Sequence, residues 1–430
     1  MHALLRLPYE FVWRAANALA PVVPSSGNKI LRTLKSRVEL KARIDAWAGA
    51  HRDLSRPLLW MHASSVGESL QALPVLNLFR ERSREVQIVF TFYSPSAETA
   101  TRNFPADFVS YLPFDTAASM RHLIESLKPT ALVFSKLDVW PTLVAEARSA
   151  GVRTGIISGT LHSDSGRSST IASLLLRDTY AALDSVGAVS AEDRANIVEL
   201  GAHASRVTVT GDTRYDQVWA RRQRDGPVEL LDHLRTNRPT IVAGSTWQSD
   251  EVHLLKSFAK TRKNHRRLRL IIAPHEPTAG SIESIISWSN SNSFTAARLD
   301  DPTAADADLV IVDRLGVLGD LYALADIAYV GGGFHRAGLH SVLEPAAFGK
   351  PVLFGAPYGR SREAELLVSN SGARAIADAS ELTAVLTQWL TDSSTRTAAG
   401  SAAEQVVKRG LGAAEASYSL ITKLLEAARL

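Results

Sequence analysis

Short apolar stretches alternate with segments of helical pattern along most of the chain, and this alternation restricts the fold more than any other feature. One series starts at Pro57 and a second starts near residue 238. Strands that alternate with helices build parallel sheets covered by helices. The chain is therefore predicted to be an α/β protein with two such sheets. The apolar stretches are residues 58–65, 86–94, 108–114, 131–136 and 154–159, then 238–245, 268–274, 307–314, 327–333, 351–355 and 373–377.

The length of the chain also favours two domains, because 430 residues exceed what one hydrophobic core usually supports. A more polar segment, residues 213–239, interrupts the alternation between the two series. Two sheets that face each other leave a cleft, the usual place for a ligand. The predicted division is an N-terminal segment 1–56, a first domain 57–215, a linker 216–238, a second domain 239–408 and a C-terminal helix 409–430.

Composition excludes several classes of protein. Hydrophobic residues make up 45% of the chain and charged residues 21%, which excludes wholesale disorder. A net charge of +4 is too small to indicate a nucleic-acid partner. The chain has no cysteine, so disulfides, thiolate metal sites and cysteine nucleophiles are excluded together.

The first 26 residues are apolar but do not form an uninterrupted membrane span. Arg6, Glu10 and Arg14 interrupt the stretch, and a secretory signal fits poorly for the same reason. An amphipathic segment remains, which either lies on an anionic membrane surface or packs on its own domain. Its apolar face is predicted to hold Leu4, Leu7, Phe11, Ala15 and Leu19, and the basic residues that follow are Lys29, Arg32, Lys35, Arg37, Lys41 and Arg43.

A glycine-rich turn follows the apolar run at 327–330. Successive glycines bring bare N–H groups close to a ligand, and a helix that starts just after them adds the positive end of its dipole. The turn is therefore predicted to bind an anion at the carboxyl end of a strand, where open α/β sheets hold ligands. A plain turn between packed elements is the alternative. The residues concerned are Gly331, Gly332, Gly333, His335, Arg336, His340 and Glu344.

In the first half, polar side chains follow the run at 58–65 where a strand meets a helix. Glu68 is the candidate general base for a substrate hydroxyl. A glutamate in the first turn of a helix is also favoured by the helix dipole, which is the alternative. The neighbouring candidates are His62, Ser64, Ser65 and Gly67.

Two further strand ends in the first half carry candidate residues. Lys136 and Asp138 follow the run at 131–136, and in extended chain their side chains point the same way. An ordinary ion pair is as good an interpretation as a binding role. Ser158 stands at the next strand end, and the recurrence of polar strand ends in one half of the chain indicates a site.

In the second half, Gly244 and Ser245 follow one strand and His275 follows the next. His275 is interpreted as a contact to a ligand phosphate, with a capping role beside Pro277 as the alternative. A metal site is not expected, because no second histidine lies four residues on and no ligand cluster is nearby.

The patterns of a P-loop, a dinucleotide-binding glycine turn and a nucleophile elbow are absent from the sequence. An anion site in one half and a candidate base in the other are what a glycosyltransferase needs when its donor is a nucleotide-activated sugar. The departing phosphate must be stabilised, and the acceptor hydroxyl must lose its proton.

Six segments, taken in order, resemble the 3-deoxy-D-manno-octulosonic acid (Kdo) transferases of lipopolysaccharide assembly. The resemblance covers nearly the whole chain and implies their two-domain GT-B fold. The segments are HASSVGES (62–69), TFYSPSAE (91–98), YLPFD (111–115), VWP (139–141), GDTRYD (211–216), and VGGGF with GLHSVLEPAAFGKPVLFG (330–355).

The resemblance implies transfer of Kdo from CMP-Kdo to a lipid A precursor at the cytoplasmic face of the inner membrane, with inversion and without a bound metal. By position, Glu68 becomes the general base and Asp138 an essential acidic residue. His275, the three glycines, His340 and Glu344 fall in the CMP-Kdo site, with Glu344 as a ribose partner. Arg336 and Lys136 are candidates for the sugar carboxylate.

The chain departs from the family pattern at several places. Lys136 and Asp138 stand where two glutamates are usual, and Leu339 and Ser341 replace the glycine and asparagine that flank the family's histidine. Two alternatives therefore stay open: another GT-B sugar-nucleotide transferase or epimerase, and a catalytically silent sugar-nucleotide-binding protein.

Overall fold

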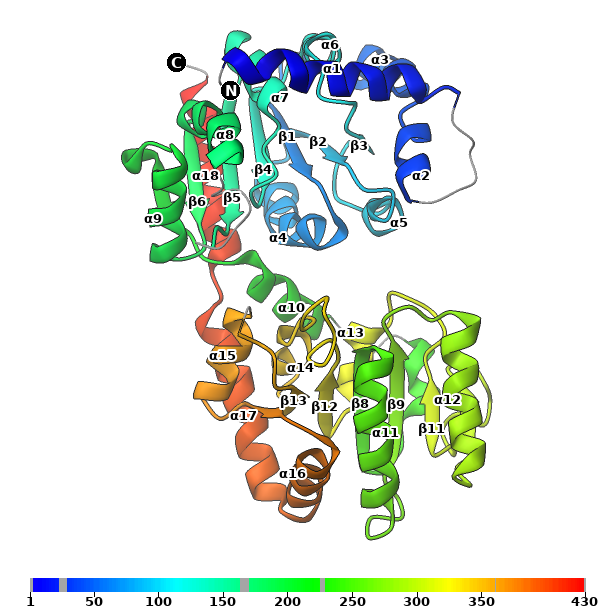
Figure 1. Cartoon of the computed structure of the whole chain (residues 1–430). Helices are drawn as coiled ribbons and strands as arrows, with labels where there is room; N and C mark the ends of the chain where they lie inside the picture. The colour runs from blue at the N-terminus through cyan, green and yellow to red at the C-terminus, as the bar shows by residue number, and fades with distance from the viewer. Residues whose placement is uncertain (1–2, 23–28, 163–169, 225–228, 360, 429–430) are drawn as a thin grey trace. The chain divides into compact units, whose positions relative to one another are not determined.

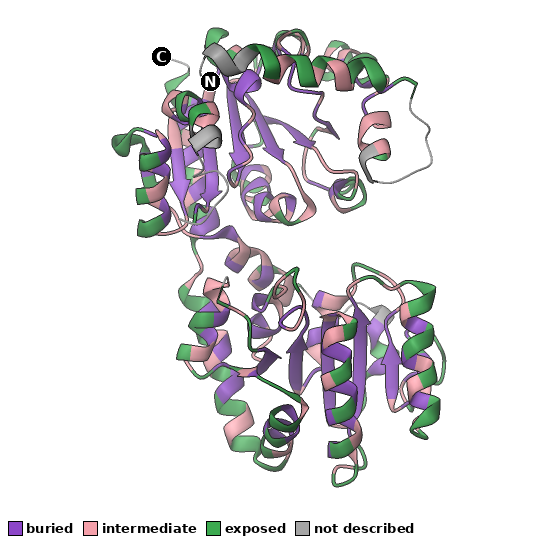
Figure 2. Ribbon diagram, in the orientation of Figure 1, coloured by how far each residue is buried: buried purple, intermediate pink, exposed green. Residues whose placement is uncertain are grey.

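The computed structural model describes residues 3–22, 29–162, 170–224, 229–359 and 361–428. The chain forms two compact units. Unit 1 comprises Met1–Gln217 with Leu411–Leu430, and unit 2 comprises Val218–Gly410. Each unit is a parallel sheet with helices packed against it (Figure 1). The inner strands of both sheets are buried while the helices expose their outer faces (Figure 2), as expected for strands covered on both sides.

Within its described residues, unit 1 has a seven-stranded sheet in the order β3-β2-β1-β4-β5-β6-β7. The strands are β1 (Leu58–Ala63), β2 (Gln87–Phe92), β3 (Phe108–Tyr111), β4 (Ala131–Ser135), β5 (Arg153–Gly159), β6 (Ser185–Ala188) and β7 (Val207–Val209). The helices are α1 (Ala3–Leu19), α2 (Lys29–Lys35), α3 (Leu40–His51), α4 (Val66–Arg82), α5 (Ala97–Thr101), α6 (Ala117–Leu127), α7 (Pro141–Ser149), α8 (Thr170–Ala182), α9 (Ala191–Leu200) and α18 (Ala413–Ala427), with a 3-10 turn at Ala204–Arg206.

The described part of unit 2 also contains seven strands, in the order β10-β11-β9-β8-β12-β13-β14. They are β8 (Thr240–Thr246), β9 (Arg269–Pro274), β10 (Ala296–Arg298), β11 (Leu309–Ile311), β12 (Ile327–Val330), β13 (Val352–Gly355) and β14 (Ala373–Ile376). The helices are α11 (Gln248–Arg262), α12 (Ala279–Ser291), α13 (Leu318–Leu321), α14 (Leu343–Ala347), α15 (Arg362–Ser369), α16 (Ala379–Thr391) and α17 (Ser393–Arg409), with 3-10 turns at Glu229–Leu234 and Tyr322–Leu324.

The segment predicted as a linker is partly helical. Helix α10 (Thr213–Gln223) passes from unit 1 into unit 2. Helix α18 belongs to unit 1, because its residues Leu420, Ile421 and Leu424 are part of that unit's core. The core of unit 1 therefore uses both ends of the chain.

Each sheet reverses its strand order once. In unit 1 the chain runs outward from β1 through β2 to β3 and then returns to place β4 on the other side of β1; in unit 2, β8 has β9 on one side and β12 on the other. Loops that leave the carboxyl ends of such strand pairs diverge and form a crevice, the usual ligand site of open α/β sheets. The loops after β1 and β4, and those after β8 and β12, carry most of the predicted site residues.

The N-terminal helix α1 packs by one face only. Tyr9 and Trp13 are half-buried against unit 1, whereas Leu7 is 77% exposed and Phe11 is 73% exposed. The interpretation of a helix packed on its own domain holds for the face with Tyr9 and Trp13, and the membrane interpretation of the exposed face stays a prediction. None of the helices in the described ranges is long and apolar enough to span a membrane.

Candidate functional site

Glu68 lies in the first turn of α4, directly after β1. Ser65 is the N-cap residue and accepts a hydrogen bond from the Glu68 N–H, while the Ser64 N–H donates to Glu68 Oε2 at 2.9 Å. The first is an N-cap bond, and the second ties the residue before the N-cap to the first turn of the helix. Gly67 beside it is exposed, and a Cβ added there would meet nothing within 4 Å. The half-buried carboxylate therefore caps its own helix and borders open space.

The loop after β4 differs from the prediction. Lys136 has a φ of 69°, in the left-handed region, so the strand ends at Ser135 and the chain turns. The prediction that Lys136 and Asp138 share one face of an extended segment is therefore wrong. The hydroxyl of Ser135 donates to the Glu68 carbonyl at 2.9 Å, which fixes the loop after β4 against the one after β1.

His62 and Ser158, both predicted as site residues, are buried structural groups with 1% exposure each. Trp140 Nε1 donates to His62 Nε2 at 3.0 Å, so the proton of the imidazole lies on Nδ1, 2.9 Å from Thr91 Oγ1. Burial lowers the pKa of His62 to about 3. Ser158 Oγ lies 2.8 Å from Thr213 Oγ1 at the start of α10. Both residues support the loops without reaching solvent.

The glycine turn of unit 2 packs against backbone. A Cβ on Gly331 would overlap the Ser245 carbonyl, one on Gly332 would overlap the Gly338 carbonyl, and one on Gly333 would overlap the backbone of Gly355. The prediction of bare N–H groups is wrong for two of the three: Gly331 N donates to Gly244 O at 2.9 Å, and Gly332 N donates to a buried carboxylate. The following helix, α14, has only 5 residues. The glycine turn that was predicted to bind an anion therefore serves mainly to let these backbone segments pack closely.

That carboxylate belongs to Asp250, which the sequence did not single out. Asp250 is fully buried in the first turn of α11. Its oxygens accept from Gly332 N at 2.8 Å, Trp247 N at 3.0 Å, Tyr329 OH at 3.2 Å and Phe334 N at 3.4 Å. One side chain therefore ties the loop after β8 to the loop after β12. From the local sequence, Asp250 can be recognised only as an acidic residue in the first turn of a helix, so its contacts to the loop after β12 could not be predicted.

Four aromatic rings gather at the strand ends of unit 2, and Trp247 is the one that the sequence analysis did not single out. Trp247 stacks on His335 at 3.9 Å and on His275 at 4.5 Å between ring centroids. His275 also stacks on His340 at 4.4 Å, and Trp247 Nε1 donates to His340 Nε2 at 3.1 Å. We call these residues the Trp247 cluster. It offers flat ring surfaces and imidazole nitrogens beside the glycine turn.

Burial, followed by the neighbouring His275, lowers the pKa of His340 to about 4. The unfolded chain takes up this proton near pH 6.5, before the folded protein does, so the contribution of His340 to the free energy of unfolding falls as pH falls from 6.5 to 4. Burial of Asp115, which raises its pKa to about 6, acts in the opposite direction below that pH. We expect His340→Gln to weaken the fall seen in urea unfolding. The same substitution at exposed His203 should leave the dependence of the unfolding free energy on pH unchanged. Equal slopes of this free energy against pH in the wild type and in His340→Gln would contradict the role given to His340.

Glu344 stands apart from the Trp247 cluster, in the first turn of α14. Burial raises its pKa, and the Arg221 guanidinium opposes that effect. Arg221 itself holds Asp320 through two hydrogen bonds of 2.7 and 3.0 Å. The Tyr322 hydroxyl lies so close to Gly244 that a Cβ there would overlap it. Arg336, by contrast, is exposed and makes no ion pair within the described part of the chain.

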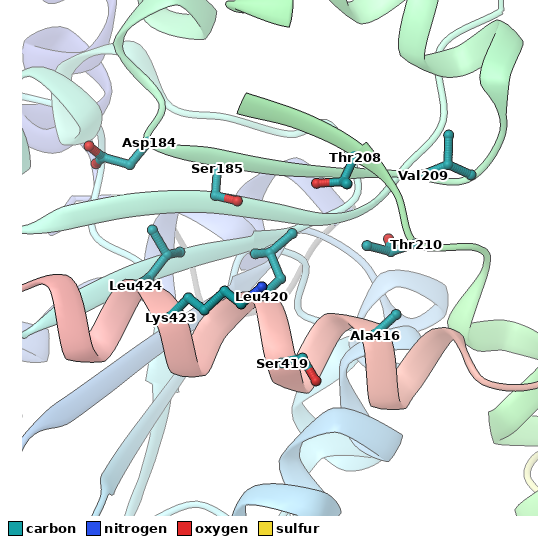
Figure 3. Close-up of a pocket in the computed structure, with 10 residues that line it drawn as sticks. All are labelled: Asp184, Ser185, Thr208, Val209, Thr210, Ala416, Ser419, Leu420, Lys423 and Leu424. Atoms are coloured by element: carbon teal, nitrogen blue, oxygen red, sulfur yellow. The ribbon is translucent and has the colours of Figure 1, made fainter. Parts of the chain in front are cut away.

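Other features of the described structure lie elsewhere. A cavity of about 370 Å³ opens between α18 and the edge of the sheet at β6 and β7 (Figure 3). Its walls include Asp184, Thr208 and Lys423 and hold none of the predicted site residues. No group of three or more histidine, aspartate or glutamate side chains in the described ranges is arranged to hold a metal ion.

The sequence of the chain is similar to known proteins over most of its length. A family model described as 3-deoxy-D-manno-octulosonic-acid transferase matches residues 34–217. A 3-deoxy-D-manno-octulosonic acid transferase of Chlamydophila psittaci is 31% identical over 340 residues, 77% of each chain. One of Haemophilus influenzae is 24% identical over 376 residues, 86% of this chain and 87% of its own.

Among solved structures, the UDP-GlcNAc 2-epimerase of Neisseria meningitidis bound to UDP-GlcNAc has a TM-score of 0.62 at 14% identity, covering 85% of this chain and all of that one. That likeness shows the fold, two Rossmann-like domains of the GT-B type. The two relatives cover 77% and 86% of the chain, and the match to the family model, residues 34–217, includes Glu68 and Asp138. The chain therefore belongs to the Kdo transferase family, glycosyltransferases of lipopolysaccharide core assembly.

Proposed function

We propose that the chain transfers Kdo from CMP-Kdo to a hydroxyl group of a lipid A precursor, with inversion at the transferred carbon and without a bound metal ion. The observation that carries the proposal is the position of Glu68. In a chain of this family, the structure has a half-buried carboxylate at the strand-order reversal of unit 1, beside a glycine that borders open space.

On the acceptor side, Glu68 takes the proton of the acceptor hydroxyl. The freed oxygen forms a bond to the anomeric carbon of Kdo, while the bond from that carbon to the phosphate oxygen of CMP breaks. Asp138 lies in the neighbouring loop, which the Ser135 hydroxyl holds against the Glu68 carbonyl. The same loop carries Lys136, whose ammonium group is our candidate partner for the sugar carboxylate.

On the donor side, side chains must supply most of the contacts to CMP-Kdo. The N–H groups of Gly332 and Gly331 already donate to Asp250 and Gly244. The ring surfaces of the Trp247 cluster suit the nucleotide base, and exposed Arg336 suits the phosphate. Glu344 remains the candidate for the ribose hydroxyls. Burial raises the pKa of Glu344, and the Arg221 guanidinium offsets part of that effect.

The direct test is incubation of the purified protein with CMP-Kdo and a tetra-acylated lipid A precursor. We expect release of CMP and formation of a Kdo-lipid product whose new linkage is inverted relative to the donor. Treatment with EDTA should leave the rate unchanged. No CMP release with this pair, together with turnover of a UDP-sugar, would replace the proposal by the epimerase alternative. Absence of any turnover would favour a silent binding protein.

We also propose that the outer face of α1 holds the protein on an anionic membrane surface. Leu7, Phe11, Val12 and Leu19 are 77%, 73%, 60% and 55% exposed, and they lie on the side of α1 opposite its packed residues. Arg32, Lys41 and Arg43 are exposed nearby in the sequence. Arg37 does not belong to the predicted basic group: it is buried, with its guanidinium 4.1 Å from the centre of the Tyr93 ring.

The double substitution Leu7→Ser/Phe11→Ser should weaken sedimentation with anionic vesicles by roughly tenfold or more, since each side chain contributes about 1.5–3 kcal/mol when buried in an apolar phase. Asn17→Ser, an exposed polar change on the same helix, is the matched control and should bind like the wild type. Because the inner face of α1 is untouched, the fold should be retained. Equal binding by the double variant and the control would leave α1 without a membrane role.

A further inference from the structure

The inner face of α1 contacts the loop that carries Asp138. We define the Asp138 loop as residues 136–140, between β4 and α7. Its last residue, Trp140, lies between three rings: Tyr93 at 4.8 Å, Trp13 of α1 at 5.5 Å and His62 at 6.2 Å between centroids. The indole N–H of Trp140 donates to His62 at 3.0 Å. Trp140 is therefore held from the core by His62 and from the surface by α1.

A second contact from α1 reaches the start of α7. Asp115 is fully buried, and its two oxygens accept from Thr142 N at 2.9 Å and Leu143 N at 2.8 Å. Tyr9 of α1 donates its hydroxyl to the same carboxylate at 2.8 Å. Burial raises the pKa of Asp115, so each donor that favours its ionised form strengthens the cap. Asp115 thus joins α1 to the N-terminus of α7, the element into which the Asp138 loop runs.

The surroundings make this arrangement rigid. Trp13 also stacks on Phe114 at 5.8 Å, next to Asp115 in the chain. Arg37, 7% exposed, donates to the Tyr93 carbonyl at 2.8 Å and lies over the Tyr93 ring, so the ring that flanks Trp140 is itself fixed. At its other end the loop is anchored by Lys136 N, which donates to Ile157 O at 2.8 Å, and by Tyr180 OH, which donates to Leu137 O at 3.0 Å.

We propose that α1 is a positioning element of the active site, in which Tyr9 and Trp13 set the geometry of the Asp138 loop through Asp115 and Trp140. The helix then has two separate tasks on two faces: apolar residues outside, positioning residues inside. The inference rests on the proposed function in one respect, namely that Asp138 takes part in transfer. The structural part of the inference, that α1 controls the position of the Asp138 loop, does not depend on the proposed function.

Tyr9→Phe is the sharpest test, because it removes one hydroxyl and keeps the ring. We expect kcat for transfer to fall by roughly tenfold or more, as small displacements of reacting groups do, with little change in KM for CMP-Kdo. Hydrogen exchange should become faster in peptides covering 137–145, where the Thr142 and Leu143 amides lie. Vesicle binding should not change. Trp13→Ala should act in the same direction, and Trp13→Phe, which keeps an aromatic ring, should recover most of the rate.

Tyr418→Phe is the matched control. It removes a hydroxyl that lies 2.9 Å from Ser83 Oγ in the same unit, away from the Asp138 loop. It should leave kcat and exchange in 137–145 as in the wild type. Faster exchange without loss of kcat in Tyr9→Phe would overturn the positioning role, and unchanged exchange would overturn the contact itself. If the wild type makes no Kdo-lipid, the proposed function fails, while the exchange experiment still decides whether α1 controls the loop.

Discussion

Glu68→Gln should lower kcat for Kdo transfer by a factor on the order of a hundred or more, because an amide cannot take the proton of the acceptor hydroxyl. The substitution is chosen to separate two roles. Glu68 Oε2 accepts from the Ser64 N–H, and glutamine serves equally well in this kind of helix cap. The melting temperature should therefore stay within about a degree or two of the wild type, since a surviving cap changes stability by only a few tenths of a kcal/mol.

Glu68→Ala provides the contrast, since it removes both the base and the bond to the Ser64 N–H, while the Ser65 cap stays. It should lose activity to the same extent and in addition lose about 1 kcal/mol of stability, the usual net contribution of a hydrogen bond. Measurement of a single turnover with enzyme in excess isolates the chemical step from product release. A Glu68→Gln enzyme that turns over at the wild-type rate would reduce Glu68 to a capping residue.

Asp250→Ala should both destabilise unit 2 and impair use of the donor. The carboxylate accepts four hydrogen bonds, and its loss leaves the buried N–H of Gly332 and the hydroxyl of Tyr329 without a partner. Each unsatisfied group costs about 1–3 kcal/mol, so a loss of roughly 3–5 kcal/mol in the free energy of unfolding is expected. The measurement is urea unfolding followed by fluorescence.

The effect on the donor should be separate from the effect on stability. Asp250 fixes the loop after β12 against Trp247, so KM for CMP-Kdo should rise even at temperatures where the variant is fully folded. Asp306→Ala, at an exposed aspartate of the same unit, is the matched control and should change neither quantity. A stable Asp250→Ala variant with normal KM would show that the glycine turn keeps its shape without this carboxylate.

The alternation of strands and helices was sufficient to predict the two sheets, because buried parallel strands need continuous apolar runs, such as Leu58–Ala63, that are visible locally. The strand ends followed to within a few residues for the same reason, although the predicted extension through Lys136 was wrong. The prediction that the glycines face a ligand failed, because the N–H of Gly332 donates to Asp250, which is 82 residues away in sequence. The local sequence shows where a glycine permits an unusual backbone conformation. It does not show whether that glycine approaches a ligand or another strand.

One other error has a similar physical origin. The left-handed turn at Lys136 depends on bonds from neighbouring elements, such as Lys136 N to Ile157 O, and these are invisible in the local sequence. For α1, helical periodicity showed one apolar stripe and left open whether that stripe packs on the domain or lies on a membrane surface. In the structure Phe11 of that stripe is exposed, and the aromatic residues Tyr9 and Trp13 on another face make the contacts.

The membership of α18 in unit 1 has a consequence for biosynthesis. A chain emerging from a ribosome presents most of unit 1 first, yet that unit's core lacks Leu420, Ile421 and Leu424 until α18 has been translated. Unit 2 is continuous in sequence and complete by Gly410. We therefore expect unit 2 to complete its folding before unit 1 during synthesis. Until α18 has been made, the first half of the chain should stay partly folded and prone to aggregation.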